Sequence, residues 1–174
     1  MGVTKQQKEP AMTTISPPDI TVFHIADWFL ARAKEDGKPL KHMKLQKLVY
    51  FAYGWYYAFY DHDVPLFEEE IYAWRYGPVV KDLYEKYKSF GSAPIITEIC
   101  EDHTFDEDVS RILRHVWNLY AACSGYQLSE ITHRPDAPWS KAYRRNEWIP
   151  YATIKPELIR EYFQSLRAQY AKKH

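Results

Sequence analysis

Glycine and net charge are both scarce in this sequence, and each shortage excludes a class of protein. Only 6 of the 174 residues are glycine, and the chain has no GxxxxGK[ST], GxGxxG or GxSxG pattern. Phosphate-cradling loops and a serine nucleophile elbow are therefore not indicated. The 23 basic and 23 acidic side chains cancel. Because affinity for a phosphate backbone comes from accumulated Lys and Arg, this balance argues against a nucleic-acid binder.

Clustered metal ligands are also missing. The two cysteines, Cys100 and Cys123, lie too far apart for a CxxC motif, and the seven histidines form no HExxH or HxH pair. The sequence thus predicts no metal site, no cofactor and no catalytic residue. Two isolated cysteines also fit the reducing cytoplasm.

Long apolar runs are absent as well. The most apolar stretch, residues 48–60, spans 13 residues, and a membrane-spanning helix needs about 20. Residues 1–18 contain three prolines and no apolar core of the kind found in a secretion signal. We therefore expect a cytoplasmic protein with no membrane span, a disordered tail over 1–18 and a flexible C-terminus over 171–174.

What the chain has in excess is aromatic side chains, which make up 17% of its residues. They concentrate in a helix predicted over 42–60, where eight of the eleven residues from 50 to 60 are aromatic. One face of this helix carries apolar residues at helical spacing: Leu45, Leu48, Val49, Ala52, Trp55, Tyr56 and Phe59. A second stripe holds Tyr50, Tyr53, Tyr57 and Tyr60. A helix that is aromatic on two sides either lies at the centre of the fold or is shared with a partner.

The remaining patterns predict a mainly α protein: one compact helical domain over 19–170, with five to seven helices and a β element of two or three strands. Asp19 is the expected N-cap of the first helix, and Pro78 is expected in the first turn of a helix over 79–89. Further helices are predicted over 106–123, 127–132 and 139–144 and from 156 onward, with Gly125 closing the first of these. Segments 71–76 and 95–99 are the predicted strands, paired with each other.

Three local segments carry a functional interpretation beside a structural one. Residues 74–79 join aromatic side chains, one cation and a Gly-Pro turn, and Thr132 and His133 shortly precede Trp139. Both segments could serve only as structural corners, and a proton-transfer role for His133 is the weaker alternative. Residues 98–108 hold six acidic side chains and no Lys or Arg. This run is either a solvated loop and helix start or an acidic docking surface for a basic partner.

The segment KLQKLVYFAYGW at 44–55 resembles the signature helix of the Panacea domain, the SocA-like antitoxin family often found in phage-associated genes. Further pieces follow in the family's order: PLF at 65–67, AWRYGPV at 73–79, Phe90-Gly91, Thr132-His133 and Pro138-Trp139. Together they cover about residues 22–143. The ordered set is more specific than any one piece.

The resemblance implies an antitoxin that neutralises a cognate toxin, encoded nearby, by direct protein binding. The toxins of such families differ in chemistry and include alarmone-synthetase-like enzymes that act on tRNA. The residues expected to contact the partner are Lys47, Tyr50, Tyr53, Tyr57, Trp74, Arg75, Tyr76, Pro78, His133 and Trp139. Asp106, Glu107 and Asp108 are the expected acidic docking residues.

Two other functions stay open at this point. A proteolytic adaptor would hold the toxin and deliver it to a protease, with the chain ends as handles. A DNA-binding phage or prophage regulator is disfavoured by the zero net charge. An enzyme is disfavoured because the sequence has no catalytic motif.

Overall fold

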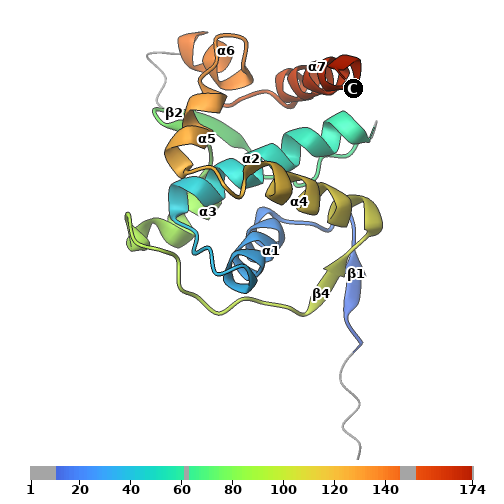
Figure 1. The fold of residues 1–174 in the computed structure, drawn as a ribbon, viewed down its shortest axis with the longest axis vertical. Coiled ribbons are helices and arrows are strands. Elements are labelled where there is room, and N and C mark those ends of the chain that lie inside the picture. The colour runs from blue at the N-terminus through green and yellow to red at the C-terminus, as the bar shows by residue number, and fades with distance from the viewer. Residues whose placement is uncertain (1–10, 61–62, 146–151, 174) are drawn as a thin grey trace, which may run out of the picture.

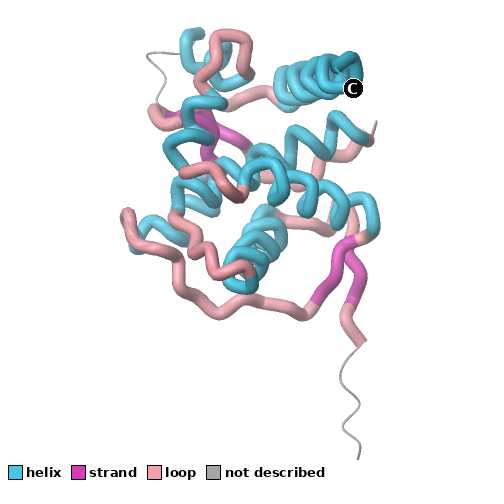
Figure 2. The backbone as a smooth tube through the Cα atoms, in the orientation of Figure 1, coloured by secondary structure: helices cyan, strands magenta, loops and turns pink. Residues whose placement is uncertain are grey.

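The computed structural model describes residues 11–60, 63–145 and 152–173, and within them it is a mainly helical domain (Figure 1). The helices are α1 (Val22–Glu35), α2 (His42–Phe59), α3 (Lys81–Tyr87), the 3-10 helix η1 (Lys88–Phe90), α4 (Glu107–Tyr120), α5 (Gly125–Thr132), α6 (Pro138–Arg145) and α7 (Pro156–Lys173). The strands are β1 (Thr13–Ile15), β2 (Ile71–Trp74), β3 (Gly77–Val80) and β4 (His103–Phe105). Figure 2 shows how small the two strand pairs are beside the helices. The predicted fold class is confirmed.

Helix α2 is the centre of the molecule. It packs against α1, α3, α4, α5, α7 and β3, and every residue from Leu45 to Ala58 is buried. Burying apolar surface on all sides explains why this helix has no polar face. Of the two alternatives for a helix that is aromatic on two sides, the structure shows the central helix.

The second tyrosine stripe of α2 is covered mainly by α7 and the segment before β2. Tyr50 packs edge-on against Phe163 of α7 with ring centroids 5.7 Å apart, and the Arg160 guanidinium lies 5.3 Å from the Tyr57 ring. Tyr53 packs against Phe67, 4.9 Å between centroids. Tyr50, Tyr53 and Tyr57 are each at most 5% exposed, so the expectation that they form an outer partner surface is corrected.

The strands differ from the predicted pairing. β2 pairs antiparallel with β3 in a hairpin whose two-residue turn is Arg75-Tyr76, and α3 starts only at Lys81. Pro78 therefore lies in a strand instead of a first helical turn, which a short edge strand tolerates because the missing N–H has no ladder partner to lose. The predicted strand over 95–99 does not form. The second sheet instead joins β1 and β4 in parallel.

The ends of several elements also differ from the sequence expectation. Thr21, not Asp19, is the N-cap of α1, and its backbone N–H donates to His24 Nδ1 at 3.0 Å. Gly125 begins α5 behind the Ser124 cap and does not close α4. Residues 13–15, expected in a disordered tail, form β1, and α7 continues through residues 171–173. The rest of the tail, 1–10, and His174 lie outside the described residues.

Candidate functional site

The β2–β3 hairpin is attached to α2 by one glutamine. Gln46 Nε2 donates to the Val80 carbonyl at 3.1 Å, and the Val80 N–H donates to Gln46 Oε1 at 2.9 Å. Gln46 is 2% exposed, so both bonds are buried. A side-chain amide that satisfies both backbone groups of one strand residue replaces the missing neighbouring strand and fixes the hairpin against the helix.

Gly77 lets the hairpin approach α2 and α5 closely. Its φ of +111° is a conformation that L side chains rarely adopt. A Cβ at this position would lie 2.8 Å from both Lys47 Cε and Thr132 Oγ1. Residue 77 is therefore glycine for two independent reasons: backbone conformation and lack of space.

Lys47 lies beneath this turn with its ammonium group inside the protein. The side chain is 1% exposed, and Nζ donates to the Pro78 carbonyl at 3.2 Å. Burial lowers the pKa of Lys47 to about 7. A lysine without a buried carboxylate partner loses its charge easily, so this residue supports the corner mainly as a hydrogen-bond donor.

Three aromatic rings form a stack beside the turn. His133 lies flat on Trp139, 3.8 Å between centroids, and Trp139 lies flat on Tyr143 at 4.7 Å. Trp139 Nε1 donates to the Trp74 carbonyl at 2.7 Å, which ties α6 to β2. Burial, with a smaller effect of Lys47, lowers the pKa of His133. The neutral imidazole therefore serves here as a flat packing surface.

We call the assembly of Lys47, residues 74–78, Ser129, Thr132, His133 and Trp139 the hairpin corner. Ser129 completes it, because its hydroxyl donates to the Tyr76 carbonyl at 2.7 Å. The turn itself points outward: Tyr76 is 58% exposed and Arg75 is exposed, with its guanidinium 5.5 Å from the Tyr76 ring. A rigid buried base thus presents one aromatic ring and one cation to the solvent.

Seven of the ten residues expected at a partner surface meet in the hairpin corner, although they come from separate parts of the chain. They are Lys47, Trp74, Arg75, Tyr76, Pro78, His133 and Trp139. The other three, the tyrosines of α2, lie under α7 and beside Phe67. Sequence reasoning missed Gln46 and Ser129, since a single polar residue at a helical position gives no signal of the strand that it will bind.

The acidic residues at the start of α4 already interact with other groups of the protein. Asp106 is its N-cap and accepts from the Val109 N–H at 2.9 Å, and Glu107 pairs with Arg111 at 3.0 Å and Arg114 at 3.5 Å. The Asp108 carboxylate interacts with the Tyr60 hydroxyl and contributes, after burial, to a raised Tyr60 pKa. These contacts account for the three acids structurally, and their docking role stays a prediction.

The part of the chain that the structure describes was also searched for a metal centre and for membrane spans. No group of three or more His, Cys, Asp or Glu side chains within 11–60, 63–145 and 152–173 could hold a metal ion. None of the helices described is both long enough and apolar enough to cross a membrane.

The sequence of the chain matches a known protein family over the range that contains the corner. The model of the family described as "Antitoxin SocA-like, Panacea domain" matches residues 45–140, which is more than half of the chain. The chain belongs to this family. A curated relative, Antitoxin SocA of Caulobacter vibrioides, is 26% identical over 137 residues, covering 72% of each protein. No solved structure matches the chain significantly.

The Panacea region contains the whole hairpin corner and leaves out α1 and α7. All corner residues lie between 47 and 139, inside the matched range. Helix α7, which covers the tyrosines of α2, and helix α1 lie outside it. The family match and the buried hydrogen-bond network therefore coincide at the corner.

Proposed function

We propose that this Panacea-domain antitoxin neutralises a toxin by direct protein binding, and that the outer side of the hairpin corner contacts the toxin. The observation that carries the proposal is the convergence of distant family-motif residues on one turn that exposes Tyr76 and Arg75. Tyrosine and arginine are enriched among the residues that dominate binding energy at protein interfaces. Lys47, Trp139 and Gln46 act from inside, by holding the turn in one conformation.

Rigid support matters because a preorganised turn loses little conformational entropy when it binds. The turn is connected to α2 through Val80, to α5 through Ser129 and to α6 through Trp139. Each of these bonds is made by the free chain, so binding need not create it.

The same proposal includes three finer points. The protein acts in the cytoplasm, as a binder and not as an enzyme, and its toxin is encoded nearby. A toxin that handles tRNA, of the alarmone-synthetase-like kind, would carry the basic surface that the acidic residues 98–108 complement.

Co-expression with the adjacent gene tests the proposal. We expect the neighbouring protein to stop growth when expressed alone, growth to recover when this chain is co-expressed, and the two proteins to co-purify. The toxin's half-life should be unchanged, because sequestration does not require degradation. A shortened half-life would favour the proteolytic adaptor. Persistent toxicity with no recoverable complex would reject direct neutralisation.

A further inference from the structure

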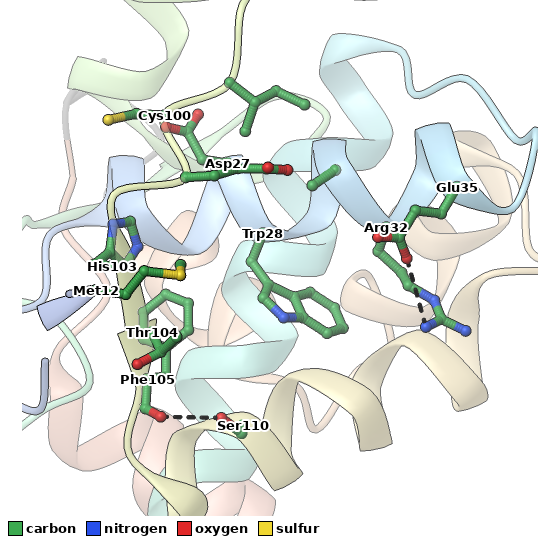
Figure 3. A pocket seen from close by; sticks show the side chains of 13 residues that line it. Met12, Asp27, Trp28, Arg32, Glu35, Cys100, His103, Thr104, Phe105 and Ser110 are labelled. Carbon is green, nitrogen blue, oxygen red and sulfur yellow. Dashed lines mark hydrogen bonds and ion pairs between the residues drawn. The ribbon is translucent and has the colours of Figure 1, made fainter. Parts of the chain in front are cut away.

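An open pocket of about 330 Å³ lies between α1 and residues 99–105, on a part of the chain that the hairpin corner does not use (Figure 3). One wall comes from a single face of α1: Asp27, Trp28, Ala31, Arg32 and Glu35. The opposite wall is the segment that leads into β4, and Met12 and Ser110 close its ends. Its volume is at the lower end of the range for ligand sites, large enough for one side chain.

The unusual feature of the pocket is the Asp27 carboxylate. Asp27 is 8% exposed, and its Oδ1 is buried without a hydrogen-bond partner in the described structure. Figure 3 shows the carboxylate among the side chains that line the pocket. Burial raises the pKa of Asp27, while the more distant Lys86 and the Cys100 backbone N–H partly oppose this. A buried carboxylate oxygen without a donor is costly, so the site favours a ligand that supplies one.

The surrounding charges point to a cationic ligand. Besides Asp27, the pocket is lined by the acids Glu35 and Glu101 and by the basic side chains Arg32 and His103. The charge of Arg32 is balanced by ion pairs with Asp36 at 3.3 Å and Glu35 at 3.9 Å. The remaining walls include the Trp28 ring, whose face suits both an alkyl chain and a cation.

From this geometry we propose that the pocket binds the end of a lysine or arginine side chain supplied by the protein partner. The alkyl stem packs between Trp28 and Ile99, and the ammonium or guanidinium group donates to Asp27 Oδ1. Of the acidic run 98–108, Glu101 lines the pocket, and the other carboxylates add negative charge along the same segment, which attracts a basic surface. That the side chain belongs to the toxin rests on the proposed function, whereas the chemistry of the pocket does not.

The pocket chemistry can be tested on the full chain without the toxin. The Cys100 thiol is exposed and lines the pocket, so an occupant should shield it from iodoacetamide, and Cys123 serves as the internal reference. We expect Nα-acetyl-arginine methylamide or the lysine analogue to slow Cys100 alkylation, and the uncharged citrulline analogue to have no effect. Asp27→Asn should weaken the protection at least about tenfold, because it removes a charge-assisted hydrogen bond.

Two further variants keep this test decisive. Ala31→Leu fills the pocket without altering Asp27 and should also abolish protection. Glu98→Gln removes an exposed charge from the same loop but outside the pocket and should leave protection intact. Circular dichroism checks that each variant is folded. No protection of Cys100, or equal protection in wild type and Asp27→Asn, would overturn the proposal that the pocket binds a cationic side chain through Asp27.

The second arm measures toxin affinity for the same variants. Asp27→Asn and Ala31→Leu should each weaken the complex at least about tenfold, and Glu98→Gln about twofold or less. If the arginine analogue protects Cys100 but toxin affinity is unchanged, the occupant is a free small cation and the partner assignment is overturned. If wild type binds no toxin while the analogue still protects, the proposed function fails and the pocket stands.

Discussion

Single residues in the hairpin corner have roles that depend on how closely backbone and side chains approach. A Cβ at position 77 would lie 2.8 Å from Lys47 Cε and Thr132 Oγ1, and Lys47 donates to Pro78, so the turn lies close against α2 and α5. The sequence predicted that a Gly-Pro turn lies here, because the dipeptide is a strong turn signal. It did not predict the hairpin. Strand β3 is held in place by the buried amide of Gln46, and nothing in the sequence indicates that contact.

Replacing Gly77 tests this close approach. Gly77→Ala should destabilise the protein by about 2–4 kcal/mol, because the positive φ is strained and the new Cβ overlaps two buried atoms. Gly37→Ala is the matched control: it has φ of +63° but nothing within 4 Å, and it should cost about 1 kcal/mol. Urea unfolding measures both values. Equal losses would show that the corner is not tightly packed.

The buried Lys47 predicts a specific pH dependence of stability. Its pKa is about 7 in the folded chain and near 10.5 when unfolded, so between these values the unfolded state binds more protons. The free energy of unfolding should therefore rise with pH, by up to about 1.4 kcal/mol per unit above pH 7. Lys47→Met should remove that component of the slope between pH 7.5 and 9.5. An identical slope in both proteins would mean that Lys47 keeps its charge.

At the scale of elements, the position of α7 decides which residues of α2 are accessible. The helical periodicity of residues 42–60 and 106–123 was sufficient to predict α2 and α4, since this signal is local. The covering of Tyr50 and Tyr57 by α7 could not be predicted, because it depends on a contact across more than 100 residues. The parallel pairing of β1 with β4 was also missed. It too joins segments far apart in the chain, and strands of only three residues give a weak sequence signal.

The contact between α2 and α7 can be measured by a double-mutant cycle. Gly54 lies directly under the Phe163 ring, so a Cβ at position 54 would overlap it. Gly54→Ala should cost about 2 kcal/mol in the wild type. Phe163→Ala alone should lower the stability by about 3–5 kcal/mol. In that background, Gly54→Ala should instead stabilise the protein by about 1 kcal/mol, because alanine is favoured over glycine inside a helix. The same effect in both backgrounds would contradict this packing.

At the scale of the whole molecule, two separate exposed regions lie outside the buried helix α2. The hairpin corner lies over the first half of α2, within the Panacea region, and the Asp27 pocket lies on α1, outside it. The aromatic excess of the sequence is explained mostly by the interior, since α2 is buried from residue 45 to 58. Of the surface that we propose for the toxin, the family motifs indicated the corner, and no sequence signal indicated Asp27.

The central claim is that the outer side of the hairpin corner binds the toxin, and the dissociation constant of the complex tests it most directly. Tyr76→Ala should weaken binding about 30-fold or more, the effect of losing an interface residue worth at least 2 kcal/mol. Tyr170→Ala is the control, because Tyr170 on α7 is 56% exposed, close to the 58% of Tyr76. It should change the dissociation constant less than twofold. A complex that forms equally well with Tyr76→Ala, or that is weakened only by Tyr170→Ala, would contradict the account.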